Sequence, residues 1–322
     1  GEDDPVAELH LFTLDGEGGL RRDGRYWLRS NDYFDADNYG ARLQGDNLLL
    51  SLQLPLELSG EMAWPEWSRR DVPSPAWTAL LEAEDLYYPT LPGTSPSLHV
   101  VLQCPLRGLD DGRFACRSTG FVASGRSELY ATPRNTYLAI GGLAAEAYGS
   151  PLIDPSDFTV PDQAWHWVRT VVLKIPFDGG APSVATVRGE VDEAFQFRDD
   201  ADGALWLLSK SSGSGGSGDT ARHSLYHLPP DAFSGFSGEP PPPRAVVELA
   251  DDPTIRFGGD AVWLAAPGWL QRGEPGFGQV WTIRLRDGAF GMLDLGHGAD
   301  HLQPVPRGML AIGQDRDAGL HV

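Results

Sequence analysis

Side chains that carry oxygen alternate in one acidic segment near the start of the chain. Asp35, Asp37 and Asn38 lie between Asn31 and Gly40, and carboxylate and amide oxygens at such a spacing are typical of calcium-binding loops. No Glu closes the segment, so it departs from the EF-hand pattern. Two hypotheses remain: a Ca²⁺ site formed by Asp35, Asp37 and Asn38, or an Asx-rich connection between strands. No other cofactor is predicted.

Catalytic patterns are missing from the sequence. It holds no Gly-x-Ser-x-Gly nucleophile elbow, phosphate loop or dinucleotide fingerprint. Eight histidines are present, and the most suggestive spacings are His223 with His227, and His297 with His301. These spacings do not form a zinc motif. Paired carboxylates for glycoside chemistry stay open, because 45 acidic residues always supply pairs. No catalytic residue is therefore predicted.

Aromatic side chains gather in segments that interrupt the regular strand pattern. Trp and Tyr are enriched at protein interfaces, which favours a binding surface for a protein partner. The two alternatives are that these side chains hold the segments onto the core, or that they stack on carbohydrate. The residues of this predicted surface are Trp64, Trp67, Trp77, Tyr87, Tyr88, Trp165, Trp167 and Trp269.

The two cysteines predict a disulfide. Cys104 and Cys116 are separated by a segment that contains Asp111-Gly112, a hairpin turn signal, and the flanking residues alternate as strands do. A hairpin folded there brings the two cysteines opposite each other, at a distance that suits a disulfide. Such a bond indicates an oxidising compartment, so we expect an extracytoplasmic location: periplasmic, outer-surface or secreted.

The charge balance limits the classes of partner. With 45 acidic against 25 basic residues the formal net charge is −20, which opposes binding to nucleic acid phosphates. No stretch approaches the roughly 20 apolar residues of a membrane-spanning helix, so direct membrane insertion is not expected. A protein partner in the cell envelope or extracellular space is predicted, and carbohydrate is kept as a second class of ligand.

The strands that must position these residues recur in one pattern. A short apolar run ends in a turn signal such as Gly-Asp or Asp-Gly, and a more apolar run follows at once. These paired strands are predicted at 40–46 with 47–54, 127–134 with 135–140, 195–203 with 204–208, 254–260 with 261–264, and 301–307 with 308–313.

Each pair is followed by a third and a fourth strand, which makes an internal repeat of four strands. Four-stranded antiparallel units in series predict an all-β fold of the β-propeller type, with about five blades' worth of strands. The whole chain, 1–322, is predicted as one domain. It is interrupted by insertions at about 57–95, 143–163 and 211–219. Half a unit at each end would form one more blade, or the chain is part of a larger propeller.

The order of these motifs resembles a family of bacterial and archaeal secreted proteins with a C-terminal β-propeller domain, distantly related to WD-repeat propellers. The segments 41–50, 128–139 and 202–206 resemble its blades, and 301–315 resembles a stretch that usually carries Leu-His-Pro and Ile-Gly. Gln303 stands where that His would be. The resemblance implies a secreted or cell-envelope location and assigns no activity.

Together these patterns predict a non-catalytic, secreted or cell-envelope propeller that acts as a protein-binding or scaffolding module. The alternative is a propeller enzyme, a hydrolase or lyase, or a carbohydrate-binding module that uses channel or loop-face residues. If the first hypothesis holds, deletion of 57–95 should leave the propeller folded and abolish partner binding.

Overall fold

The computed structural model describes most of the chain, and its described part is built of β-strands and three short 3-10 helices. The helices are Ala83–Asp85, Ala194–Gln196 and Pro230–Ala232. No helix among the described residues is long and apolar enough to span a membrane. The described residues are 6–29, 40–56, 64–88, 96–106, 116–144, 168–212, 220–235, 239–250, 253–266, 277–306, 308–314 and 320–321.

Chain contacts divide the molecule into two compact units. The first holds Gly1–Ile140 with Lys174–Pro182, and the second holds Gly141–Leu173 with Ser183–Val322. One domain is predicted over 1–322, whereas the contacts of the structure cluster in two groups. Each unit is described by itself below.

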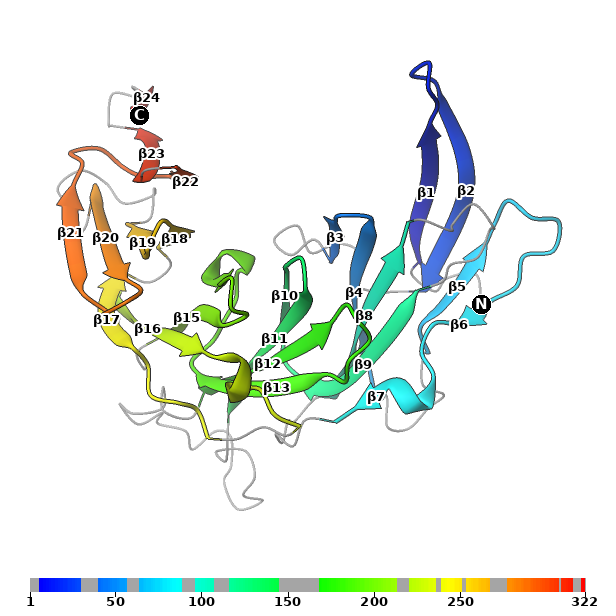
Figure 1. Cartoon of the computed structure of the whole chain (residues 1–322), viewed down its shortest axis with the longest axis horizontal. Coiled ribbons are helices and arrows are strands. Elements are labelled where there is room, and N and C mark those ends of the chain that lie inside the picture. Colours follow the sequence, from blue (N-terminus) through cyan, green and yellow to red (C-terminus); the bar gives the residue numbers. More distant parts are fainter. Residues whose placement is uncertain are drawn as a thin grey trace, which may run out of the picture. The chain divides into compact units, whose positions relative to one another are not determined.

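Two sheets belong to the first unit. One has the order β1-β2-β5-β6, and the other has the order β3-β4-β8-β9-β7, in which β7 runs parallel to β9 (Figure 1). The strands of the first sheet are β1 Val6–Leu14, β2 Leu20–Arg29, β5 Glu66–Arg69 and β6 Thr78–Ala79. Those of the second are β3 Ala41–Gln44, β4 Asn47–Pro55, β7 Leu86–Tyr87, β8 Pro96–Pro105 and β9 Arg117–Ser124.

Three sheets lie in the second unit, with the orders β14-β15-β16-β17, β18-β19-β20-β21 and β22-β23-β24. A further sheet, β10-β11-β12-β13, contributes strands to both units. The bounds are β10 Ser127–Ala131, β11 Asn135–Ala144, β12 Val168–Pro176, β13 Ser183–Arg188, β14 Phe197–Asp199, β15 Leu205–Ser212, β16 Thr220–Leu228, β17 Ala245–Ala250, β18 Thr254–Gly258, β19 Ala261–Ala265, β20 Gln279–Arg284, β21 Phe290–Asp294, β22 His301–Val305, β23 Gly308–Gln314 and β24 Leu320–His321.

The predicted fold class is confirmed, because the described chain is all-β and repeats four-stranded antiparallel sheets of the kind that form propeller blades. All five predicted strand pairs are present, as β3/β4, β10/β11, β14/β15, β18/β19 and β22/β23. The strand-then-turn pattern identified them because each pair is joined by a tight local turn, which the local sequence encodes.

The predicted insertion at 57–95 lies between β4 and β8, the second and third strands of their sheet, and it contains strands of its own. Its residues supply β5 and β6 to the sheet of β1 and β2, and β7 to the sheet of β9. The predicted terminal half-blades also differ, since β1 and β2 pair with β5 and β6, whereas β22, β23 and β24 form their own sheet. Deletion of 57–95 would therefore remove strands from two sheets. Most of the predicted insertions at 143–163 and 211–219 lies outside the described residues.

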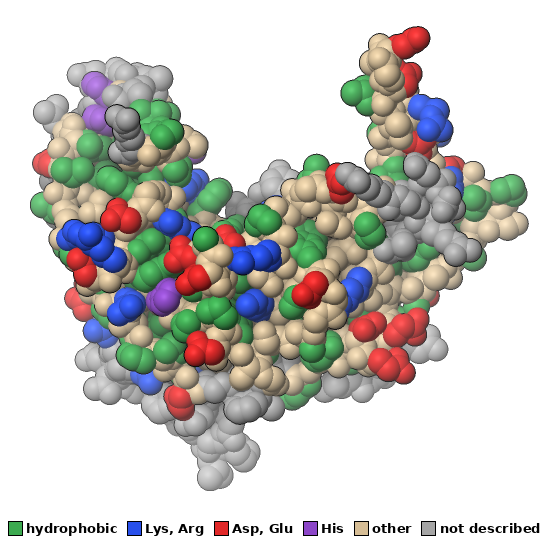
Figure 2. Space-filling model, viewed as in Figure 1, with side chains coloured by type: hydrophobic (Ala, Val, Ile, Leu, Met, Phe, Trp, Pro, Cys, Tyr) green, Lys and Arg blue, Asp and Glu red, His purple; other side chains and the backbone are tan. Residues whose placement is uncertain are grey.

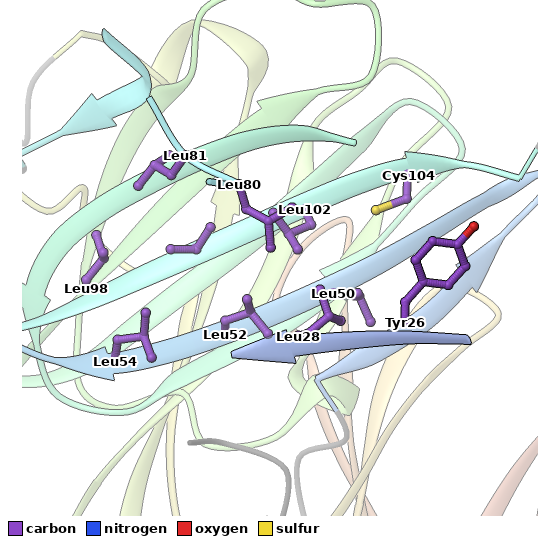
Figure 3. Close-up of a cluster of buried hydrophobic side chains, with 11 residues drawn as sticks. Tyr26, Leu28, Leu50, Leu52, Leu54, Leu80, Leu81, Leu98, Leu102 and Cys104 are labelled. Carbon is purple, nitrogen blue, oxygen red and sulfur yellow. The ribbon is translucent and has the colours of Figure 1, made fainter. Parts of the chain in front are cut away.

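The core of the first unit forms between its two sheets (Figure 3). Leu50, Leu52 and Leu54 alternate along β4, and each lies opposite an apolar residue of β8. One face of this sheet is therefore apolar. Tyr26 and Leu28 of β2 cover that face from the neighbouring sheet. The period of two in the sequence places all these side chains on the same side.

In the second unit, the apolar second strands of neighbouring sheets pack against each other. Trp206 and Leu208 of β15 share one cluster with Val262 and Leu264 of β19, and with Ile283 of β20. The second strands are also the more apolar strands of the pairs that the sequence predicts. The packing buries one face of the sheet that holds β15 and β16, and leaves the opposite face for other contacts.

The predicted disulfide is present between Cys104, at the end of β8, and Cys116, just before β9. These two strands are an antiparallel pair, so the bond links the two sides of one hairpin. Cys104 is buried in the core cluster of the first unit. The predicted turn at 110–112 lies outside the described residues.

Candidate functional site

The predicted aromatic surface separates into buried and exposed members. Trp64 and Trp67 pack against the core of the first unit, and the Trp64 indole Nε1 donates a hydrogen bond of 2.6 Å to the Leu81 carbonyl. The Arg29 guanidinium lies 4.7 Å above the Trp77 ring. Tyr87 is partly exposed and Tyr88 is exposed. The structure therefore gives Trp64 and Trp67 packing contacts in the core of the first unit.

Several predicted site residues lie outside the described residues: Trp165, Trp167 and Trp269 of the aromatic surface, and Asp35, Asp37 and Asn38 of the predicted calcium site. Among the described residues, no group of three or more His, Cys, Asp or Glu side chains is placed to bind a metal ion. His297 stacks on His321 with ring centroids 5.0 Å apart, and its Nδ1 lies 2.7 Å from the Gly298 carbonyl. Neither contact forms a metal site.

A groove of about 460 Å³ opens in the second unit beside β16. We name it the β16 groove. Its walls combine two guanidinium groups, three hydroxyl groups and a run of prolines. The lining residues are Arg188, Ser211, Arg222, Ser224, Tyr226, Val246 and the four prolines of 240–243.

Strand register explains why the polar residues meet. Ser211 of β15 lies opposite Arg222 of β16, and Ser224 of β16 lies opposite Val246 of β17. Because side chains alternate between the two faces of a sheet, Arg222, Ser224 and Tyr226 share one face of β16. The other face carries Leu225, which is part of the core. One side of the strand is therefore core and the other is the floor of the groove.

The backbone of Arg188, at the end of β13, is held beside β15 and β16 by two hydrogen bonds. Its amide donates a hydrogen bond of 3.3 Å to the Tyr226 hydroxyl, and its carbonyl accepts one of 2.6 Å from the Ser209 hydroxyl. The next residue, Gly189, has φ +89°, and a Cβ there would lie 2.7 Å from the Lys210 carbonyl oxygen. The close approach of the two chains therefore requires glycine.

The Tyr226 phenol is almost fully buried, and that burial raises its pKa above the ordinary value of 10. The hydrogen bond from the Arg188 amide, the charges of Arg188 and Arg222, and a hydrogen bond with Ser224 act in the opposite direction and are smaller. Tyr226 is therefore a neutral phenol at physiological pH, and it can both donate and accept a hydrogen bond. Both guanidinium groups lie close enough to act on it.

Prolines supply another part of the lining. Residues 240–243 are four consecutive prolines, which fix the backbone in an extended conformation and offer no N–H donor. Glu239 precedes the run, and its Oε1 lies 3.6 Å from Nη2 of Arg169 on β12. This wall is thus stiff, apolar on its ring faces, and attached at one end by an ion pair.

The composition of the groove suits an anionic ligand that also has an apolar face. Guanidinium groups bind carboxylates, sulfates and phosphates through paired charge-assisted hydrogen bonds. A wall of prolines can contact the apolar side of the same molecule. On the face drawn in Figure 2 the described basic and acidic side chains are interspersed. The lining of the β16 groove, in contrast, includes two arginines and no acidic residue, which suits an anion better than a mixed surface does.

Sequence reasoning missed this site. The signal was the alternation of Arg222, Ser224 and Tyr226 along one strand. Polar side chains on a strand between two others need hydrogen-bond partners, which a neighbouring element or a ligand can supply. The proline run at 240–243 is equally visible in the sequence, but nothing in its local pattern links it to β16. The contribution of Arg188 could not be recognised, because it comes from a strand of another sheet.

Comparison with known proteins gave matches to solved structures only. No family model matches, and no curated protein matches, so the resemblance to a secreted propeller family stays a prediction. One matched structure is an ACO/RPE65 chimera, at 14% identity and TM-score 0.34, with coverage of 80% of this chain and 59% of that chain. Another is cobalt-substituted ACO from Synechocystis, at 13% identity and TM-score 0.34, with coverage of 80% and 53%.

A third matched structure is a mutant of the same Synechocystis enzyme, at 12% identity and TM-score 0.36, with coverage of 98% of this chain and 80% of that chain. This chain therefore spans just over half the length of the first two matched structures. Similarity this weak transfers no substrate, mechanism or residue role to this chain.

Two predictions are nevertheless corrected by these comparisons. The matched structures are described as apocarotenoid oxygenases, which are enzymes, so the prediction of a non-catalytic scaffold is contradicted and the enzyme alternative agrees better. The prediction that the chain needs no cofactor, with Ca²⁺ as the one metal considered, is contradicted by the same matches, one of which is described as cobalt-substituted. The described residues offer no donor set for a metal.

Proposed function

We propose that this chain is a β-propeller enzyme of the hydrolase or lyase type that binds an anionic substrate in the β16 groove. The observation that carries the proposal is the convergence of Arg188, Arg222 and the neutral phenol of Tyr226 on one groove, which the four prolines also line. The whole chain has a net charge of −20, whereas the lining of this groove includes two arginines and no acidic residue.

Each residue has a distinct role in this proposal. Arg222 and Arg188 bind the anionic group of the substrate and neutralise its charge. Tyr226 donates its phenolic proton to the oxygen that leaves when the substrate bond breaks. In a hydrolase, a water molecule adds to the atom that lost this oxygen and returns a proton to the phenolate. In a lyase, the phenolate takes the proton of the neighbouring carbon, and a carbon–carbon double bond forms. Ser224 holds the Tyr226 hydroxyl through their hydrogen bond. The lining residues include no pair of carboxylates, so the two-carboxylate mechanism of glycoside hydrolysis is not assigned to this groove.

The proposal is tested with three anionic probes: polygalacturonate, dextran sulfate and p-nitrophenyl phosphate. We expect turnover of at least one probe, measured as new reducing ends or released nitrophenolate. Tyr226→Phe keeps the ring and removes the proton, so it should lower kcat by about 10²-fold or more. Because the same hydroxyl accepts the hydrogen bond of the Arg188 amide, KM should rise by a smaller factor. Arg222→Gln should raise KM, because it removes a binding charge.

Arg286→Gln is the matched control, since Arg286 is an exposed arginine that pairs with its neighbour Asp287 on a turn. It should leave both kinetic constants unchanged. Binding of a probe without turnover would identify a carbohydrate-binding or anion-binding module instead. Absence of both binding and turnover for all three probes would overturn the proposal.

We further propose an extracytoplasmic location. The support is the disulfide between Cys104 and Cys116, because such bonds persist in oxidising compartments. Cell fractionation of the native host that found the chain in a reducing cytosol, with both thiols free, would contradict this location.

A further inference from the structure

The walls of the β16 groove differ in what they can bind, and this difference constrains the substrate beyond its charge. Part of the lining consists of the hydroxyls of Ser211, Ser224 and Tyr226 and the two arginines, and another part consists of the four prolines. A ligand that satisfies both walls has a polar edge and an apolar face. The volume of about 460 Å³ lies within the range for small-molecule sites, and exceeds what a lone inorganic anion needs.

The proline wall also discriminates between anions. Phosphate sites are commonly built from several backbone N–H groups, in nests or at helix N-termini. The four prolines of 240–243 have no N–H group, so this wall offers no such donors. A phosphate or sulfate would direct an oxygen at apolar rings, at a desolvation cost. A carboxylate has only two oxygens, which the planar guanidiniums can bind in pairs.

We infer that the groove takes a carboxylate-bearing pyranose, a hexuronic acid unit of a glycan, with its carboxylate on Arg222 and Arg188 and one C–H face of the ring against the prolines. This inference rests on the proposed function and specifies its substrate class. The ring hydroxyls of the sugar lie at Ser211, Ser224 and Tyr226, which can each donate or accept.

A matched pair of ligands isolates the carboxylate. Trigalacturonate and its fully methyl-esterified form share rings and hydroxyls and differ in charge. Calorimetry should show at least tenfold weaker binding of the ester, because it loses charge-assisted hydrogen bonds worth about 1.5–3 kcal/mol each, or roughly 10- to 100-fold in Kd. Equal binding of acid and ester would overturn the inference.

Protein variants locate the site. Arg222→Gln should weaken trigalacturonate binding at least tenfold and leave the weak binding of the ester nearly unchanged. Arg188→Gln should act in the same direction, and it serves as a second variant if Arg222→Gln lowers folding stability. Pro241→Ala with Pro242→Ala should weaken acid and ester by a similar factor, because both ligands use the ring contact. Arg286→Gln is again the control.

A third comparison separates the substrate class from the function. If dextran sulfate or p-nitrophenyl phosphate binds in an Arg222-dependent way and trigalacturonate does not, the hexuronic acid inference fails and the anionic-substrate proposal stands. If Arg222→Gln, Arg188→Gln and the proline variant all bind trigalacturonate like the wild type, the ligand binds elsewhere and the inference is overturned. If none of the probes binds, both fail.

Discussion

Burial in the second sheet of the first unit keeps the His99 imidazole neutral. His99 lies on β8 and is fully buried, and its Nε2 donates a hydrogen bond of 3.2 Å to the Ala123 carbonyl. The loss of hydration lowers its pKa to about 4, against which the hydrogen bond to Ala123 acts weakly. A histidine in the unfolded chain has a pKa near 6.5, so unfolding raises the affinity of this group for a proton.

The sign of the resulting pH dependence follows. Between pH about 6.5 and about 4 the unfolded state binds a proton that the native state does not, so the free energy of unfolding falls as the pH falls. The slope approaches 1.4 kcal/mol per pH unit. His99→Gln removes the titrating group, so urea unfolding of this variant at pH 7 and pH 5 should differ less than that of the wild type.

His301→Gln is the control, because His301 is exposed at the start of β22. This variant should show the pH dependence of the wild type. The same pH dependence in His99→Gln as in the wild type would show that another group causes the acid sensitivity.

At the scale of elements, the contact between the end of β13 and β15 positions the β16 groove. Backbone hydrogen bonds join Glu190 to Lys210 in both directions, at 2.7 and 2.8 Å, and the Ser209 and Tyr226 side chains hold Arg188. Gly189 lies inside this junction with a positive φ. The groove therefore depends on a backbone contact as much as on its own side chains.

Gly189→Ala should disturb both stability and binding. The new methyl would lie within 3 Å of the Lys210 carbonyl oxygen and of the Ser209 and Ser211 hydroxyls, and alanine is disfavoured at positive φ by about 1 kcal/mol or more. We expect a lower melting temperature and weaker trigalacturonate binding. Gly235→Ala is the matched control, because nothing lies within 4 Å of its added Cβ. A wild-type melting temperature for Gly189→Ala would show that the junction is not rigid.

At the scale of the whole molecule, the disulfide and the β16 groove belong to different units. Cys104 and Cys116 lie in the first unit, and the residues of the groove lie in the second. A bond that closes a loop of this length contributes about 3 kcal/mol in the chain-entropy model. Its stabilisation should therefore act mainly on β4, β8 and β9, the strands next to the bond.

Reduction with dithiothreitol tests this separation. Hydrogen exchange measured by mass spectrometry should show reduced protection in β8 and β9, with protection in β15, β16 and β19 largely unchanged, because local stability can vary between cooperative units. Before reduction, a thiol titration of the denatured protein should find no free cysteine. An equal loss of protection in both units would indicate that they unfold as one.

The sequence alone indicated an all-β chain, where the five tight strand pairs lie, and that Cys104 can reach Cys116. These features depend on neighbours in the chain: a turn of a few residues and a period of two, both of which local sequence encodes. The confirmed pairs β14/β15 and β18/β19 are examples. The polar face of Arg222, Ser224 and Tyr226 was also readable from alternation, although its purpose was not.

Only the tertiary structure decided what those strands meet. The partners of β2 are β1 and β5, and the residues of β5 lie in a segment whose local pattern suggested an insertion. Arg188 joins Tyr226 across 38 residues of chain, and the prolines of 240–243 line the same groove as the hydroxyls of β15 and β16. Such contacts depend on how sheets pack, which no local propensity encodes, and the groove exists only where those packed sheets bring its walls together.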